Sequence, residues 1–205
     1  MTSIFGLLIE KIKNKAYQRV PKRILTGTAN NIESEYISTK SIIGHNITIL
    51  KNTHISEDST IDSYTHIGYN TLITKSTIGR YNSIASNVNI GHGEHPINDI
   101  STNMLFFEEP YSILTEKQCC IEHDVWIGVN STIRRGVNIG IGAIIGANSF
   151  VNKNVPAYAI VVGSPAKIIR YRFEKTKIEK ILESQWWLKD LEEARKIVNR
   201  LKDEP

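Results

Sequence analysis

The sequence has little of several features that mark particular classes of protein. Its only cysteines are Cys119 and Cys120, and neighbouring residues do not satisfy the geometry of an ordinary disulfide. We expect both to be thiols in a reducing compartment. No dense cluster of arginines interleaved with aromatic residues is present, so no nucleic-acid partner is expected. The balance of 25 Lys and Arg against 21 Asp and Glu is only slightly basic, as on a solvated surface.

A long hydrophobic run is also missing. The opening segment MTSIFGLLIEKIKNKAYQRV starts with apolar residues, but the run is too short to span a bilayer and no small-residue cleavage site follows. A cytoplasmic location is therefore expected. We predict an N-terminal helical cap over residues 1–31, in which the helical pattern covers residues 4–17. Lysines beside the apolar residues would also permit weak contact of this segment with a membrane surface.

What the sequence has in abundance is an aliphatic residue at every sixth position. The row runs from Ile37 to Ile73, continues after a one-residue deletion from Ile78 to Ile90, and resumes from Ile121 to Val151. A second row, two positions before each aliphatic residue, is almost entirely small and includes Cys119, which therefore reads as a packing residue rather than a nucleophile. The exceptions in this second row are Glu35, Ile47 and Asn82.

A period of six matches neither an α-helix nor a simple alternating strand. It matches a coil with flat faces, in which the large aliphatic residue points inward, the small residue fills a corner, and glycine eases the turn. Three faces give a coil of about eighteen residues, stacked on the next at the usual strand spacing of roughly 4.8 Å. The predicted fold class is mainly β, with a parallel β-helix over residues 32–170.

Two segments depart from the repeat. Residues 91–120, which begin GHGEHPINDIST, separate Ile90 from Ile121 and are predicted to project as a loop arm. Long insertions in a regular scaffold often carry function. Residues 171–205 space their apolar side chains at three and four, which predicts a C-terminal extension of one or two amphipathic helices. Its Trp186 and Trp187 are expected to pack on the solenoid or on a neighbouring subunit.

Histidine is the residue type best suited to act as a general base, because a neutral imidazole can take a proton from a reacting group near pH 7. The histidines of the regular coils at non-core positions read most simply as solvated surface residues; they are His45, His54 and His66. His92 and His95 lie in the arm, where the repeat breaks. These two are the candidates for a general base.

Several motifs together carry a family likeness. The hexads, the loop GHGEHPINDIST, the restart DVWIGVNSTIRRGVNIGIGAIIGANSFV and the close VVGSPAKIIR resemble those of the hexapeptide-repeat acyltransferases. The likeness covers residues 32–170. It is greatest to the branch that holds maltose, galactoside and nodulation-sugar acetyltransferases, xenobiotic acetyltransferases and polysaccharide O-acetyltransferases. The resemblance implies a left-handed parallel β-helix, a homotrimer, and transfer of an acetyl group from acetyl-CoA in a cleft between subunits.

The resemblance also implies site residues. The family's histidine, followed by Ser-Thr and then aromatic residues, matches His95, which is the expected base ahead of His92. Glu94 and Asp99 are expected at the substrate, and either of them or Glu122 could orient the imidazole. The residues that match cofactor positions are Trp126, Gly128, Ala147, Lys153, Lys167 and Arg170. Lysine and arginine suit the phosphates of coenzyme A, although each could equally be a solvated surface residue.

The predicted function is acetyl-CoA-dependent O-acetylation of a saccharide, such as a precursor of a surface polysaccharide or lipopolysaccharide. The same histidine base and acetyl-CoA site would also serve an N-acetyltransferase for an amino sugar or nucleotide-amino sugar, or an antibiotic acetyltransferase. The arm departs from many relatives at Asn103 and Met104, where they have a small residue and a proline, so the identity of the acceptor stays open.

Two other classes fit less well. A zinc hydratase of the γ-carbonic anhydrase type needs three converging imidazoles. The positions eighteen residues after His45, His54 and His66 hold no histidine, so no metal is expected. A non-catalytic scaffold or ice-binding solenoid would need neither the arm nor the basic residues of the segment VVGSPAKIIR. An ice-binding face would also show regular threonine ladders.

Overall fold

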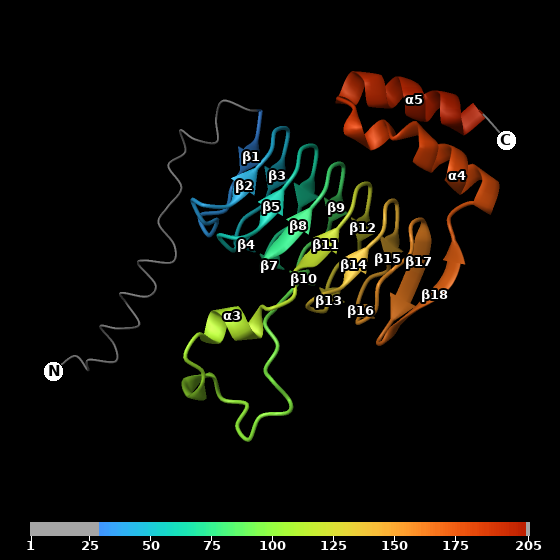
Figure 1. Cartoon of the computed structure of the whole chain (residues 1–205). Helices are drawn as coiled ribbons and strands as arrows, with labels where there is room; N and C mark the ends of the chain where they lie inside the picture. The colour runs from blue at the N-terminus through green and yellow to red at the C-terminus, as the bar shows by residue number, and fades with distance from the viewer. Residues whose placement is uncertain (1–28, 204–205) are drawn as a thin grey trace.

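The computed structural model describes residues 29–203, which form a parallel β-solenoid with a projecting arm and C-terminal helices (Figure 1). The mainly β fold class is confirmed. The predicted N-terminal cap falls almost entirely on residues 1–28, which lie outside the described residues. No helix between residues 29 and 203 is long and apolar enough to cross a membrane.

Each coil adds one short strand to each of three sheets. Sheet A consists of β1 (Asn31–Ile32), β3 (Thr48–Ile49), β6 (His66–Ile67), β9 (Ser83–Ile84), β12 (Trp126–Ile127), β15 (Ile144–Ile145), β17 (Ala159–Gly163) and β18 (Ala166–Tyr171). Sheet B consists of β4 (His54–Ile55), β7 (Leu72–Ile73), β10 (Asn89–Ile90), β13 (Thr132–Ile133) and β16 (Phe150–Val151). Sheet C consists of β2 (Ile42–Ile43), β5 (Thr60–Ile61), β8 (Ser76–Ile78), β11 (Cys119–Ile121) and β14 (Asn138–Ile139).

The aliphatic row forms the core. Parallel pairing stacks equivalent anchors on one another, as with Ile67, Ile84 and Ile127 of sheet A, and each of these side chains is at most 1% exposed. The branched side chains suit this pleated, stacked surface. The hexad spacing predicted from the sequence is therefore the register of the sheets. The same register continues across the arm, because β9 pairs directly with β12 and β10 with β13.

The small-residue row does more than fill corners. Its hydroxyl groups donate hydrogen bonds to carbonyl oxygens of the next coil: Thr53 to Gly68 at 2.7 Å, Thr65 to Gly79 at 2.9 Å, and Ser131 to Gly146 at 3.0 Å. These hydroxyl-bearing residues are almost fully buried. Buried polar groups must find partners within the protein, and for these three hydroxyl groups the partner is the backbone of the adjacent coil. Serine and threonine thus tie successive coils together.

The corner between sheets A and B carries a ladder of asparagines. Their side-chain amides form a continuous chain of hydrogen bonds of 3.1–3.2 Å through Asn52, Asn70, Asn87, Asn130 and Asn148. All have positive φ angles between 54° and 60°. Asparagine tolerates this left-handed conformation better than other residues with a side chain, which explains its recurrence at the turn.

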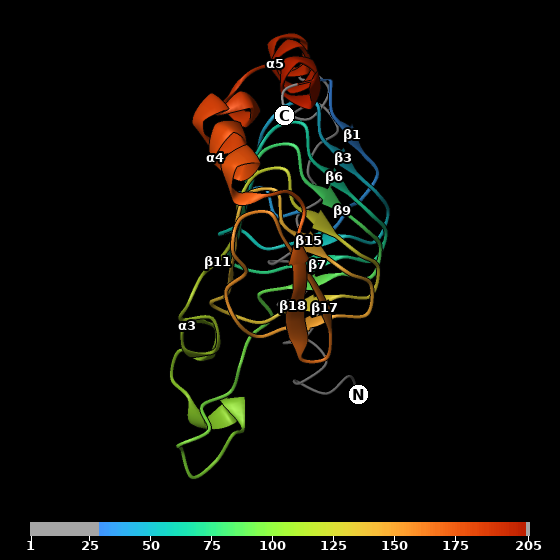
Figure 2. The ribbon, with the colours of Figure 1, turned by 90° about the vertical axis from the view of Figure 1, so that its right-hand side faces the viewer.

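The arm leaves the solenoid after β10 and returns at β11. It holds the short helix η1 (Met104–Phe106) and helix α3 (Pro110–Leu114), and both views show it projecting from the solenoid (Figures 1 and 2). It ends at residue 118 rather than 120, because Cys119 and Cys120 already belong to β11. Its outer part exposes large apolar side chains, with Ile97 88% and Leu105 83% exposed.

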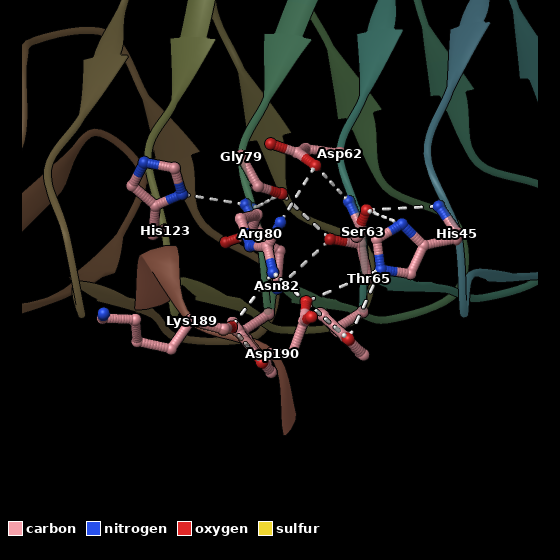
Figure 3. A network of polar contacts seen from close by, with 12 residues as sticks. His45, Asp62, Ser63, Thr65, Gly79, Arg80, Asn82, His123, Lys189 and Asp190 are labelled. Carbon is pink, nitrogen blue, oxygen red and sulfur yellow. Dashed lines mark hydrogen bonds and ion pairs between the residues drawn. The ribbon is translucent and has the colours of Figure 1, made fainter. Parts of the chain in front are cut away.

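The C-terminal extension folds as α4 (Lys175–Ser184), η2 (Trp186–Leu188) and α5 (Leu191–Asp203). It lies against the corner where sheet C turns into sheet A (Figures 2 and 3). Tyr81 donates a hydrogen bond of 2.7 Å to the Lys189 carbonyl, and Arg80 donates one of 3.0 Å to the same oxygen. Trp187 is only 4% exposed and stacks on His123 at 6.0 Å between ring centroids. The predicted packing of these tryptophans on the solenoid is what the structure shows.

His123 makes this contact sensitive to pH. Its Nδ1 accepts a hydrogen bond of 2.9 Å from the Arg80 N–H, which requires an unprotonated Nδ1 (Figure 3). Burial lowers the pKa of His123, and the Arg80 charge lowers it further, whereas Asp62 and Glu122 oppose the shift. A depressed pKa means that the folded state favours neutral imidazole, so the stability is present above the ordinary value of about 6.5 and is lost as the pH falls through the folded pKa.

We therefore expect the helical extension to loosen on acidification below about pH 6.5. Tryptophan fluorescence followed from pH 8 to pH 4.5 should report it, because the protonated ring would lie against Trp187. His123→Asn keeps an acceptor for the Arg80 N–H but cannot titrate, and should lack this transition. A variant with the same transition as the parent protein would show that another group, such as His54, whose pKa burial also lowers, is responsible.

Candidate functional site

The main candidate site is a cleft between the arm and the corner where sheet B turns into sheet C. Its volume is about 890 Å³, within the size range of small-molecule sites. The arm contributes Glu94 and His95 to its wall. The cationic side chains that line it are Lys117, Arg134, Arg135 and Lys153. A cleft of this composition suits a ligand with negative charge, with an imidazole at its edge.

The hydrogen bond of His95 defines its tautomer. The ring Nδ1 contacts the carbonyl oxygen of Thr102, seven residues further along the arm. A carbonyl oxygen only accepts hydrogen bonds, so Nδ1 carries the proton and Nε2 of the neutral ring has a lone pair. This is the arrangement that a histidine base needs. His92 is exposed on the same arm, and the residues that line the cleft do not include it.

The carboxylates that could have oriented His95 have other partners. Glu94 accepts two hydrogen bonds from Arg134, at 2.6 and 2.8 Å. Asp99 accepts one from the N–H of Ile100 at 2.8 Å. Glu122 lies at the corner of sheets C and A, where it accepts one from the N–H of Ile141 at 2.9 Å. The group that orients the imidazole is thus a backbone carbonyl.

The residues that match cofactor positions do not converge within one chain. Lys153 shares the cleft with His95. Trp126 stands on the outer face of sheet A and is 54% exposed. Gly128 is buried against Ala147 of the next coil, where an added Cβ would lie 2.5 Å from the Ala147 nitrogen, so glycine permits the close approach of the two coils.

The two remaining predicted residues lie on the last strand. Lys167 and Arg170 belong to β18 and are exposed. Arg170 lines a second cavity of about 950 Å³ with Arg172 and Lys175, at the junction of β18 and α4. Cationic side chains therefore occur at two places, the arm cleft and the end of the solenoid. Each could contact phosphate groups.

Three cleft residues were not among those predicted from the sequence: Lys117, Arg134 and Arg135. A usable signal was present for Arg135, which stands eighteen residues, or one coil, before Lys153. Applying the stacking argument used for the histidines to the basic residues would have placed both at one corner. Lys117 stands eighteen residues before Arg135, so the same spacing was available to place it at this corner.

The sequence predicts that Cys119 is a packing residue rather than a nucleophile, and that the protein holds no metal. Burial raises the pKa of the Cys119 thiol, whose sulfur lies 3.1 Å from the carbonyl oxygen of Arg134. A buried thiol with a raised pKa is a poor nucleophile, as expected for a packing residue. Within residues 29–203, no group of three or more His, Cys, Asp and Glu side chains could hold a metal ion.

Comparison with known proteins finds acetyltransferases. No family model matches the chain. A probable macrolide acetyltransferase of Lysinibacillus sphaericus is 57% identical over 67 residues, which are 33% of this chain and 37% of that protein. A chloramphenicol acetyltransferase of Klebsiella aerogenes is 47% identical over 75 residues, which are 37% of this chain and 36% of that protein. The chain thus matches little more than a third of the length of these relatives.

One solved structure shows the same fold over nearly its whole length. It is a variant of AntD, an N-acyltransferase from Bacillus cereus, in complex with dTDP and coenzyme A. The TM-score is 0.59 and the identity 22%, over 82% of this chain and 97% of that one. The curated relatives and the solenoid together confirm the predicted resemblance to hexapeptide-repeat acetyltransferases.

Proposed function

We propose that the protein is an acetyl-CoA-dependent acetyltransferase that uses His95 as its general base. The observation that carries the proposal is the imidazole of His95, which is held through Nδ1 by the Thr102 carbonyl at the edge of a cation-lined cleft. Nε2 would take the proton of an acceptor hydroxyl as its oxygen attacks the thioester carbonyl. The tetrahedral intermediate would then release the thiolate of coenzyme A, and the imidazolium would return the proton to it.

The donor site is proposed to form between two copies of the chain. His95 and Lys153 lie at the corner of sheets B and C, whereas Trp126 lies on sheet A. A homotrimer would bring the cleft of one copy against the exposed Trp126 of the next, and the apolar outer part of the arm would be covered. In this arrangement Lys167, Arg170 and Lys153 are available to the phosphates of coenzyme A.

The proposed acceptor is a saccharide hydroxyl, with the reaction taking place in the cytoplasm. Two observations favour other acceptors of the same chemistry. The curated relatives act on macrolide and chloramphenicol, as their names state, and the solved structure belongs to an N-acyltransferase that binds dTDP. An antibiotic hydroxyl and the amine of a nucleotide-linked amino sugar are therefore the alternative acceptors.

A screen of acetyl-CoA consumption tests the proposal and ranks these acceptors. The panel contains sugars, nucleotide sugars, amino sugars, a macrolide and chloramphenicol, and free thiol is measured. We expect thiol release with one class of acceptor and saturable binding of coenzyme A by calorimetry. Absence of both binding and thiol release across the panel would rule out the proposed activity in favour of a non-catalytic solenoid.

A further inference from the structure

The arm is closed into a loop at its base. The N–H of Glu94 donates a hydrogen bond of 2.9 Å to the carbonyl oxygen of Leu114, which joins the outgoing and returning segments. Helix α3 also contacts the solenoid, since the Tyr111 hydroxyl donates to the Asp58 carboxylate at 2.9 Å. These contacts fix the arm on its returning side.

Glu94 holds the segment through which the arm leaves the solenoid. Arg134, which follows β13, donates from Nε and Nη2 to the two oxygens of the Glu94 carboxylate at 2.6 and 2.8 Å. Exposed ion pairs usually contribute little, but a two-point contact fixes direction as well as distance. The two side chains are 49% and 41% exposed, so the pair lies at the edge of the cleft rather than in the core.

Arg135, the residue after Arg134, holds the segment through which the arm returns to the solenoid. Arg135 is only 7% exposed, and its guanidinium donates to the carbonyl oxygens of Thr74 and Lys75 in the solenoid and of Lys117 in the arm, at 3.0–3.1 Å. A buried guanidinium is costly unless it is hydrogen-bonded. Its three bonds therefore join the arm firmly to the coil below. Arg134 and Arg135 together fix both ends of the arm to one corner.

His95 depends on this arrangement. The hydrogen bond of its ring goes to Thr102, which is itself part of the arm. The Thr102 carbonyl sets the tautomer and the tilt of the ring, but it does not set the position of the ring relative to the solenoid. That position follows from the neighbouring Glu94, whose main chain and side chain are both held.

We infer that the Glu94–Arg134 ion pair positions His95 over the cleft, and that Arg134 acts through Glu94 rather than on a ligand. The inference rests on the proposed function, in which His95 is the base. The two donor groups of Arg134 that face the arm are both used by Glu94, and the charge of the pair is balanced. Glu94 is accordingly a positioning residue and not an acceptor-binding one.

Breaking the pair should lower kcat and leave cofactor binding unchanged. A displacement of the base by about 1 Å can cost about a hundredfold, so Arg134→Gln and Glu94→Gln should each lower kcat by roughly tenfold to a hundredfold. The dissociation constant of coenzyme A should stay within about twofold, since the Arg134 donors that face the arm are already used by Glu94. Exchanging the two residues, as Glu94→Arg with Arg134→Glu, should restore much of kcat. Glu193→Gln in α5 removes a comparably exposed ion pair with Lys189, which precedes that helix, and should have no effect.

A measurement without turnover separates this inference from the proposed function. Nuclear Overhauser effects between the ring protons of His95 and the solenoid side chains that line the cleft report the position of the ring relative to the solenoid. We expect these contacts in the parent protein, their loss in Arg134→Gln and their recovery in the exchanged variant, whereas the tautomer that the Thr102 carbonyl sets should be the same in all three. This result, together with no thiol release by the parent protein, would contradict the proposed function and leave the positioning role intact.

Two outcomes overturn the inference. One is a parent-like ring position and kcat in Arg134→Gln. The other is weaker binding of coenzyme A that the exchanged variant does not restore, which would make Arg134 a phosphate contact. Arg134→Lys guards against misfolding, because it keeps the charge but cannot reproduce the two-point contact. It should lie between the parent protein and Arg134→Gln in kcat.

Discussion

Replacement of His95 by alanine is expected to lower kcat by about a hundredfold to ten-thousandfold, the usual contribution of a general base. The variant keeps the arm anchors, because Glu94, Arg134 and Arg135 are untouched, and loses only the imidazole that the Thr102 carbonyl holds. Affinity for coenzyme A should be unchanged, since the base acts on the acceptor proton and not on the donor. Steady-state kinetics with the best acceptor of the panel, together with calorimetry for coenzyme A, would measure both quantities.

His92→Ala is the matched control for this prediction. His92 is a second exposed histidine of the same arm, three positions earlier, and it does not line the cleft. Its replacement should leave kcat within about twofold of the parent value. A large loss in His92→Ala with normal turnover in His95→Ala would reverse the assignment of the base. Equal losses in both would mean that the two imidazoles act together.

The repeat made most of the solenoid predictable. A core residue at every sixth position leaves only one stacking register, because any slip would turn aliphatic side chains outward. That is why the arm could be located from Ile90 and Ile121 alone, and why β10 and β11 flank it in the structure. The C-terminal extension, predicted as one or two amphipathic helices, followed equally from apolar spacing, since amphipathic periodicity is a local property.

The site was less predictable for a physical reason. The group that orients His95 is the backbone carbonyl of Thr102, and a carbonyl is present at every residue, so no residue type marks it. The partner of Glu94 is Arg134, 40 residues away, and the contact exists only because the arm folds back on a later coil. Contacts across an insertion depend on the path of an irregular loop. No periodicity specifies that path.

Asn82, one of the exceptions in the small-residue row, joins coils in a different way from the serines and threonines of that row. Serine and threonine join two coils by one hydroxyl, whereas Asn82 joins the coils on either side of the arm through both the nitrogen and the oxygen of its side-chain amide. Its side-chain nitrogen donates to the carbonyl oxygens of Gly79 and Glu122, both at 2.8 Å. Its oxygen accepts from the N–H of Val125 at 2.7 Å. The larger Asn82 side chain thus lies where the arm interrupts the regular succession of coils.

Replacement of Asn82 by alanine is consequently expected to be the most destabilising of the changes considered. The side chain is 1% exposed, and its loss leaves the Val125 N–H and the Glu122 carbonyl without their partner, whereas the Gly79 carbonyl keeps its bond from Thr65. At about 1–3 kcal/mol for each unsatisfied group, with some relief from entering water, the free energy of unfolding should fall by about 2–4 kcal/mol. Denaturant unfolding followed by circular dichroism would measure this loss.

Two further variants make the Asn82 prediction specific. Asn82→Asp keeps an acceptor for Val125 but sets a carboxylate oxygen against the carbonyls of Gly79 and Glu122, so it should be at least as unstable as the alanine variant at neutral pH. Asn89→Ala removes a half-exposed asparagine from the outer face of β10 and should cost less than about 0.5 kcal/mol. A loss below about 1 kcal/mol for Asn82→Ala would mean that the hydroxyl row and the aliphatic core hold these coils together without the amide. Because Asn82 joins the two coils between which the arm emerges, we expect its loss to release the arm base first and to lower turnover in conditions where the rest of the solenoid is still folded.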